Sequence, residues 1–386
     1  MMTINIPDDS FLNHWVTQFE NTEVWPSWRV AIGLGIVGAV LGRGVCFPYG
    51  EVGEIWPNMS VLLIGDSGDG KDTIIKPAER VMDEVGVPFI AGKTIEAVKQ
   101  SLHSVGNPAI GYISAKELSE FLGSKDYQAG IVQSLTDLLS TGAKVDITTK
   151  GDLKDGVPRW IYNPTLTMFA GSTPEWLQTG LPPGSLEGGF LPRFVVVTET
   201  NKAASGIRMI PNPGEYENFE QRQRVFTAKQ KFIEAIQEVK TRFNGAAVRF
   251  TDEESGRLYY NNWYINRFRH FSPTTRAYAN RSAGLMRKVA MLMAVTRGHS
   301  WVEEVDYEFA SELILHAAGK LERSVIAVSK EVTIGDVVVG MIPCKFSHVL
   351  AQLSPKYGPM WVKRAVTYLI ESGQARLVEG ELVRPT

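Results

Sequence analysis

The chain has 386 residues, 44% of them hydrophobic, and a formal net charge of −2, so it is long enough for two or three domains of roughly 100–200 residues each. The near-neutral charge argues against a protein whose whole surface binds nucleic acid, although a local basic stripe remains compatible with it. Its two cysteines, Cys46 and Cys344, exclude a disulfide framework and a cysteine-based zinc cluster, which favours a reducing, cytoplasmic compartment.

The first sixty residues are expected to form helices and a hairpin. Phe11 to Leu41 has a helical pattern that Pro26 breaks, and Gly42 to Trp56 has the glycine spacing of a β-hairpin. The most apolar stretch, Val30 to Leu41, is shorter than the roughly 20 residues of a membrane-spanning helix. We therefore expect a buried helix there and no membrane contact.

Short apolar runs then alternate with helical patterns, which predicts a mostly parallel α/β sheet. The runs are Val61–Ile64, Pro88–Ala91, Ala109–Ile113, Thr165–Phe169 and Phe194–Val197. Between the third and fourth runs, Lys144 to Tyr162 alternates without a helical period, which predicts a β-hairpin that projects from the sheet.

The C-terminal half changes to helical patterns, at residues 219–243, 253–271, 275–296 and 305–328, which predict a helical lid. Three short helices at residues 334–341, 346–353 and 361–371, followed by a hairpin at 375–384, are typical of a winged helix. The expected domains are an N-terminal segment at 1–55, an α/β core at 56–213, the lid at 214–329 and the winged helix at 330–386.

One glycine-rich segment carries the clearest chemical signal. It follows the first apolar run and precedes a predicted helix, and it matches the pattern G-x-x-x-x-G-K with the residues Gly65, Asp66, Ser67, Gly68, Asp69, Gly70 and Lys71. Backbone N–H groups of such a loop surround a β-phosphate, and the lysine neutralises the β- and γ-phosphate oxygens. The segment predicts the ATP-binding loop of a P-loop ATPase; a glycine-rich turn without a ligand is the alternative.

The magnesium side of the predicted site departs from the common pattern. The position that normally carries a Ser or Thr is Asp72. Thr73 points roughly 100° further round the helix, so it cannot simply replace the missing hydroxyl, but it is counted among the residues of the expected nucleotide site. Because Mg²⁺ accepts carboxylates, Asp72 is the candidate metal ligand. Glu117, after the third run, is the candidate base that orients the attacking water, and Lys116 precedes it where an Asp is usual. We expect Asp72 and Lys116 to form an ion pair that keeps the local charge near its ordinary value. The alternative for Glu117 is that it only stabilises the N-terminus of a helix.

Several further motifs follow in a fixed order between Trp28 and Gly298. They are Trp56-Pro57-Asn58, Glu117-Leu118, Asn163-Pro164-Thr165-Leu166, Gly171-Ser172-Thr173-Pro174 and Gly188-Gly189-Phe190-Leu191-Pro192-Arg193-Phe194. Together with the loop they resemble the helicase-like ATPase domain of phage and plasmid replication proteins. That domain is often fused to primases, belongs to the AAA+ class and is distantly related to minichromosome maintenance helicases.

The resemblance also implies roles for two sensors and an arginine finger. Ser172 or Thr173 occupies the place of the first sensor of the γ-phosphate, and Arg193 that of the arginine finger, which in a ring reaches the ATP of a neighbouring copy. Arg281 is the candidate second sensor and contacts the nucleotide; Arg287 fits less well. A solvated strand cap is the alternative for Arg193, and an exposed helix face for the lid arginines.

The same resemblance implies single-stranded DNA as a partner, gripped by the hairpin at Lys150 and Lys154, with an ordinary solvated hairpin as the alternative. The winged helix is expected to contact either DNA or protein, with Lys356, Lys363 and Arg364 available for phosphates.

The expected function is that of an ATP-dependent and Mg²⁺-dependent DNA helicase of a phage or mobile element. It is expected to form a homo-oligomeric, hexameric ring in the cytoplasm of a bacterial cell or phage-infected host, with a primase as a further candidate partner. An ATP-gated replication initiator or helicase loader with slow hydrolysis is the alternative, and a protein-remodelling ATPase is a third possibility.

Overall fold

The chain folds into two compact units, Met1–Glu322 and Arg323–Thr386. The computed structural model describes residues 4–20, 22–49, 53–92, 94–122, 125–140, 142, 144–148, 159–181, 189–199, 219–271, 276–321, 338–339, 341–357, 359–371, 375–378 and 380–383. Among these residues, no helix has both the length and the apolar character needed to cross a membrane.

The first unit is built on a parallel four-stranded sheet, which confirms the predicted α/β class. Its order is β4-β7-β3-β8, and the strands are β3 (Ser60–Ile64), β4 (Ile110–Ala115), β7 (Thr165–Ser172) and β8 (Phe194–Thr198). The predicted run at residues 88–91 makes only a single parallel bridge, from Phe89 to Tyr112, and is not a full strand. All eight residues of β7 are buried, as expected for a parallel strand covered on both faces.

Helices cover this sheet. The N-terminal helical pattern is interrupted before Pro26, as expected, and forms two helices, α1 (Leu12–Thr17) and α2 (Pro26–Leu41). Pro26 is the first residue of α2, where its missing N–H costs no hydrogen bond. The α2 helix packs on the central strands, and a Cβ atom at Gly38 would lie 2.4 Å from the Pro57 carbonyl oxygen. The helix that follows β3 is α3 (Lys71–Glu84).

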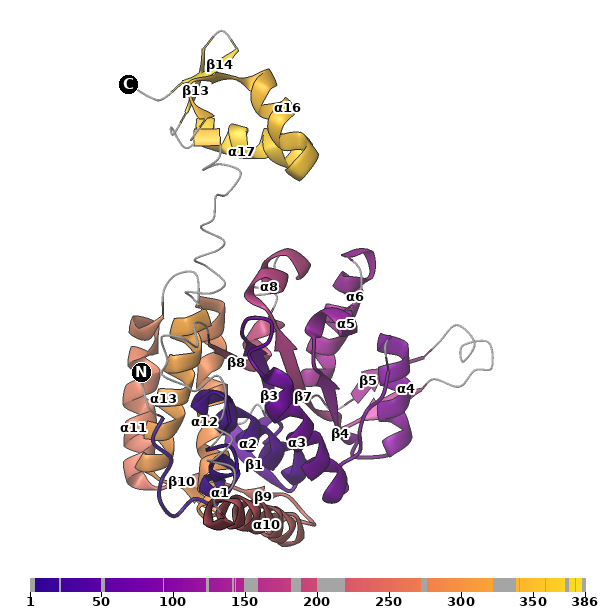
Figure 1. Cartoon of the computed structure of the whole chain (residues 1–386), viewed down its shortest axis with the longest axis vertical. Helices are drawn as coiled ribbons and strands as arrows, with labels where there is room; N and C mark the ends of the chain where they lie inside the picture. The colour runs from indigo at the N-terminus through magenta and orange to yellow at the C-terminus, as the bar shows by residue number, and fades with distance from the viewer. Residues whose placement is uncertain are drawn as a thin grey trace. The chain divides into compact units, whose positions relative to one another are not determined.

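Two groups of helices lie at the two sides of the first unit (Figure 1). On the side of β4 are α4 (Ile95–Val105), α5 (Leu118–Leu122) and α6 (Lys125–Leu139). On the side of β8 are α11 (Glu254–Asn266), α12 (Arg276–Thr296) and α13 (Glu304–Leu321). The 3-10 helix η3 (Arg267–His270) directly follows α11. The other helices are α8 (Pro174–Gly180), the 3-10 helix η1 (Leu191–Arg193) and α10 (Phe219–Arg242).

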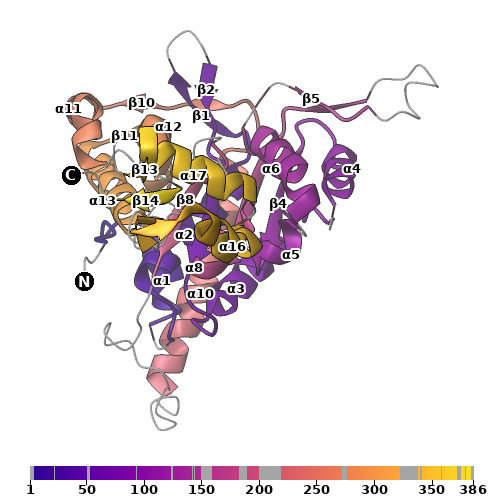
Figure 2. The ribbon, with the colours of Figure 1, turned by 90° about the horizontal axis from the view of Figure 1, so that it is seen from above.

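Small sheets complete the first unit. The predicted N-terminal hairpin is present as β1 (Val45–Tyr49) and β2 (Gly53–Ile55), and β1 also pairs with β9 (Val248–Arg249). The predicted projecting hairpin has an antiparallel stem of β5 (Lys144–Asp146) and β6 (Trp160–Tyr162), and Figure 2 shows this stem on the side of α4, away from α11. Residues 149–158, which include Lys150 and Lys154, lie outside the described residues.

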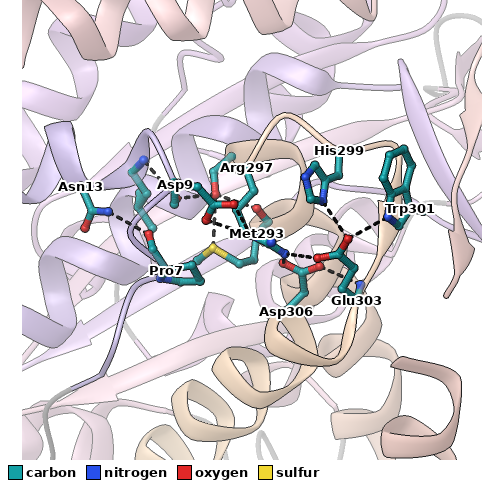
Figure 3. Close-up of polar contacts among 12 residues, drawn as sticks. Pro7, Asp9, Asn13, Met293, Arg297, His299, Trp301, Glu303 and Asp306 are labelled. Carbon is teal, nitrogen blue, oxygen red and sulfur yellow. Dashed lines mark hydrogen bonds and ion pairs between the residues drawn. The ribbon is translucent and has the colours of Figure 1, made fainter. Parts of the chain in front are cut away.

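Arg297 joins the N-terminal segment to the helical region (Figure 3). It follows α12, and its guanidinium contacts Asp9 at 3.0 Å, Glu303 at 2.9 Å and Asp306 at 3.1 Å. Two short strands, β10 (Thr251–Asp252) and β11 (Trp301–Val302), pair beside it. These carboxylates raise the pKa of Arg297 even though burial opposes its charge.

The second unit has its own apolar core, which includes Val349, Val362, Leu369 and Leu382. Two helices, α16 (Phe346–Tyr357) and α17 (Pro359–Glu371), pack on a three-stranded antiparallel sheet of β12 (Cys344–Lys345), β14 (Glu381–Val383) and β13 (Arg376–Val378). Most of residues 334–341, the first predicted helix of this region, lies outside the described residues.

Candidate functional site

The glycine-rich loop lies at the carboxyl edge of the parallel sheet, between β3 and the first turn of α3. Gly68 and Gly70 have φ values of +86° and +80°, a region that residues with a Cβ rarely adopt. The β3 strand is central, with β7 on one side and β8 on the other. In open parallel sheets, ligands bind at this edge, where successive connections run in opposite directions.

The interior of the loop is filled by its own side chains. The Lys71 ammonium is buried and donates hydrogen bonds to the carbonyl oxygens of Gly65, at 2.9 Å, and Asp66, at 3.1 Å. The buried Asp69 carboxylate accepts from the Asp66 N–H at 2.8 Å. In this conformation the lysine and one loop amide are therefore engaged within the loop. Asp66, Ser67 and Gly68 form its exposed rim.

The end of β7 contacts this loop directly. The Gly65 N–H donates to the Ser172 carbonyl oxygen at 3.2 Å. A Cβ atom at Gly171 would lie 2.3 Å from the Lys116 carbonyl oxygen and 3.2 Å from Lys71 Cδ, so the absence of a side chain lets β7, the lysine and the end of β4 meet. The sheet thus brings Lys71, Ser172 and the segment that contains Glu117 to one edge, as the sequence predicts.

The two candidate sensor hydroxyls differ in their engagement. Thr173 Oγ accepts from the Trp176 N–H at 3.3 Å and caps α8. The buried Ser172 Oγ donates to the Thr173 carbonyl at 3.3 Å. Because the cap occupies Thr173, Ser172 is the better candidate for contact with a bound phosphate.

The expected ion pair between Asp72 and Lys116 is wrong. Asp72 lies 3.1 Å from Lys76, one turn along α3, and Lys116 lies 3.8 Å from Glu79, which also accepts from Ser114 at 2.5 Å. Side chains four residues apart on one helix are neighbours whatever the tertiary structure, so Lys76 reaches Asp72 more easily than Lys116, which comes from another element. Within the described part of the chain, no group of three or more His, Cys, Asp or Glu side chains is placed to hold a metal ion, so Asp72 stands as a single candidate ligand.

The two candidate arginines lie at the other edge of the sheet. Arg193 ends η1 just before β8, and Phe194 pairs with Ser60, the first residue of β3, whereas the loop follows the last residue, Ile64. Four residue steps at about 3.3 Å each separate these edges by about 13 Å. Within one copy, Arg193 and Lys71 therefore stand at opposite ends of neighbouring strands.

Arg193, Arg281 and Lys288 border a cavity of about 330 Å³ at this amino edge, with Glu54, Tyr49 and Trp56 among the other lining residues. A Cβ atom at Gly189 would lie 2.9 Å from guanidinium nitrogens of both Arg193 and Arg281, which shows how closely the two approach. Arg193 donates to Ser140 Oγ at 2.6 Å and to the Gly189 carbonyl at 2.5 Å. Burial, followed by the nearby Arg281 charge, lowers the pKa of Arg193 to about 10.

The weaker sensor candidate, Arg287, has a structural environment. Its guanidinium lies 4.2 Å from the Tyr260 ring centroid and 4.8 Å from that of Phe47, and 3.9 Å from Asp252. These contacts hold it between α11 and β1, so it joins the helical region to the hairpin and is not a sensor candidate.

A groove of about 510 Å³ begins beside the loop, between α1, α3 and α10. Thr73, two residues after Lys71, lies at its wall, and its apolar lining includes Phe19, Pro77, Val225 and Phe226. Sequence patterns gave no sign of this groove or of Lys288, because neither has a motif and both depend on which distant elements pack together.

No protein-family model matches this chain, and a search of curated proteins also found no match.

Proposed function

We propose that this chain is a P-loop ATPase of the AAA+ class whose ATP site is shared between neighbouring copies in a ring, and that it drives DNA unwinding or translocation. One observation carries the proposal: the loop with Lys71 and Ser172 is at one edge of the sheet, and Arg193 with Arg281 is at the other. At about 13 Å, the arginines of one copy cannot touch phosphates on its own loop. In a head-to-tail ring, the amino edge of one copy faces the carboxyl edge of the next, and the two sets meet.

The loop and the adjoining groove fit ATP. A triphosphate would bind on the loop amides at the start of α3, after Lys71 turns from the Gly65 and Asp66 carbonyls. The groove has the size and apolar lining of small-molecule sites, and its wall at Thr73 is within reach of a base attached to these phosphates. Asp72 is exposed enough to exchange Lys76 for Mg²⁺, which when bound neutralises charge on the β- and γ-phosphates.

Residues at both edges then have distinct tasks. Glu117 orients the attacking water, and the Ser172 hydroxyl contacts the γ-phosphate. Arg193 and Arg281 of the next copy stabilise charge in the transition state, with Lys288 as a third cation of the same cavity. The helicase activity and the single-stranded DNA partner rest on the motif order between Trp28 and Gly298. The two helices and three-stranded sheet of the second unit support a winged helix.

A second candidate function, an ATP-gated initiator or helicase loader, is favoured by the closed loop. Lys71 is held by loop carbonyls and the Asp69 carboxylate occupies a loop amide, so binding must first rearrange both groups, which suits slow turnover. Strand displacement from a forked DNA duplex separates the two functions. A motor displaces the strand with DNA-stimulated ATP hydrolysis, whereas a loader hydrolyses ATP without displacement.

Two substitutions test the shared site. Lys71→Ala should abolish ATP binding measured by calorimetry, because the loop loses its phosphate ligand. Arg193→Ala should keep binding within a few fold but reduce ATP turnover by about 10³-fold or more, as arginine-finger losses do. Equal ATP turnover in the wild type and Arg193→Ala would contradict the proposal, and so would unchanged ATP binding by folded Lys71→Ala.

A further inference from the structure

A long basic stretch of the helical region has no acidic residue. Residues 255–302 contain neither Asp nor Glu, although the whole chain has 42 of them. The Lys and Arg residues of this stretch are Arg257, Arg267, Arg269, Arg276, Arg281, Arg287, Lys288 and Arg297. In a chain of net charge −2, this stretch is a strong local concentration of positive charge.

Four of these cations have positions that account for them. Arg287 and Arg297 pair with carboxylates from elsewhere in the chain, as Figure 3 shows for Arg297. Arg281 and Lys288 line the amino-edge cavity. Of the other four, Arg267 and Arg269 are close together in the chain. They lie on η3, directly after α11.

Around these two arginines, two aromatic rings and one aliphatic side chain reach the surface. Tyr264, Ile265 and Phe268 have exposed fractions of 38%, 76% and 41%. The Arg267 guanidinium lies 3.8 Å from the Tyr264 ring centroid and 4.3 Å from that of Phe268, and it donates to the Tyr264 carbonyl at 2.5 Å. Arg269 and His270 are exposed and make no ion pair within the described part of the chain. We call these six residues the η3 surface.

We propose that the η3 surface binds single-stranded nucleic acid, with bases stacked on Tyr264 and Phe268 and phosphates bound by Arg267 and Arg269. Exposed rings beside unpaired cations are the chemistry that single strands require, because every base has a π-face and every nucleotide a negative charge. Arg267 is already ordered by its two rings, so little side-chain freedom is lost on binding. The absence of Asp and Glu from residues 255–302 suits a polyanion, whereas a protein partner would need a matching acidic surface.

This surface is a different place from the hairpin expected to contact DNA. Figures 1 and 2 both show α11, the helix that leads into η3, on the opposite side of the first unit from the β5–β6 stem. The proposal also does not depend on ATP, since none of the six residues lies at the loop or lines the amino-edge cavity.

The test measures binding of a fluorescein-labelled oligothymidylate to the full chain without nucleotide, by fluorescence anisotropy at several salt concentrations. Tyr264→Ala should weaken binding about 5-fold or more through lost stacking, with an unchanged salt slope. Arg269→Ala should weaken it and reduce the slope of log K against log salt by about 0.7, the value for one phosphate contact on a single strand. Tyr264→Phe and Arg269→Lys should bind nearly as the wild type does.

Arg224→Ala is the matched control, because Arg224 is an exposed arginine already paired with Glu20 at 3.0 Å. The proposal is overturned if the wild type does not bind at low salt, or if Tyr264→Ala and Arg269→Ala bind like the control. It is also overturned if they change only the oligomeric state in sedimentation, since the surface would then be a contact between copies. Lys71→Ala should still bind the oligothymidylate in the absence of nucleotide. A failure of the ATPase proposal and a failure of this proposal can therefore be told apart.

Discussion

Lys288 shows how a residue without a motif becomes a candidate for function. Its ammonium donates to the carbonyl and side-chain oxygens of Asn58, and burial lowers its pKa to about 8. Arg193, Arg281, Glu54 and Tyr49 line the same cavity. The sequence places Lys288 next to Arg287 on a predicted helix. It does not reveal that Lys288 lines the cavity whereas Arg287 lies against the rings of Tyr260 and Phe47.

The lowered pKa of Lys288 gives a pH-dependent stability. Between about pH 8 and about pH 10, the unfolded chain holds the Lys288 proton and the folded chain does not, so folding gains stability as pH rises. Lys288→Met removes this gain. The wild type should therefore gain about 1–3 kcal/mol of unfolding free energy relative to Lys288→Met from pH 7 to pH 10, measured by urea denaturation. Lys231→Met, on the exposed face of α10, is the control. A constant difference between wild type and Lys288→Met over this range would contradict the assignment.

The loop residues show what a motif can and cannot predict. The pattern from Gly65 to Lys71 predicted the position of the loop between strand and helix. It did not predict that the Asp69 carboxylate turns inward or that Asp72 pairs with Lys76. Which side chains pair depends on distances in the folded structure, and the spacing of residues in the sequence does not give these distances.

At the scale of elements, Glu199 ties three parts of the first unit together. It follows β8 at the carboxyl edge, and its N–H donates to the Ile64 carbonyl at 2.8 Å. Its buried carboxylate accepts from Ser27 of α2 at 2.5 Å, from His316 of α13 at 2.9 Å, and from Lys320. Burial opposes its ionisation, but these hydrogen bonds hold the pKa of Glu199 below its ordinary value.

Replacing this carboxylate should loosen the joint between sheet and helices. Glu199→Gln should lower the unfolding free energy by about 3 kcal/mol at pH 7, because Lys320 loses its counter-charge and the buried hydrogen bonds with Ser27 and His316 are weakened. Since the folded pKa is depressed, the wild-type advantage is present above the unfolded pKa and should shrink as pH falls through the folded value. Urea denaturation at pH 7 and pH 4 measures both effects. Glu308→Gln, on the exposed side of α13, is the control and should change neither the stability at pH 7 nor its dependence on pH. Equal denaturation midpoints for Glu199→Gln and the wild type at pH 7 would contradict this role of Glu199.

Periodicity predicted the long elements well. Four of the five apolar runs became the parallel strands, and the helical patterns became α10 to α13, although residues 322–328 of the last pattern lie outside the described residues. It failed where strands are short or pair at a distance. The two-residue β12 has no period, and the pairing of β1 with β9 joins residues about 200 positions apart.

At the scale of the whole molecule, the strand order decides how the candidate site is divided. The sequence supplied the chemical groups, including Lys71, Glu117, Ser172 and Arg193. Only the parallel register showed that the arginines stand at the amino edge and the loop at the carboxyl edge. Arg281, expected as a second sensor at the nucleotide, lies with Arg193, so the proposed ring assigns both arginines to the neighbour's ATP.

The most direct test of the shared site mixes two inactive variants. Lys71→Ala keeps the arginines, and Arg193→Ala keeps the loop, so an interface between the two contains one complete site. In randomly mixed rings at equal amounts, about a quarter of the interfaces are complete, and ATP turnover should recover to about a quarter of the wild-type value. Turnover that stays at the level of the separate variants, in mixtures shown to exchange subunits, would contradict a site built from two copies.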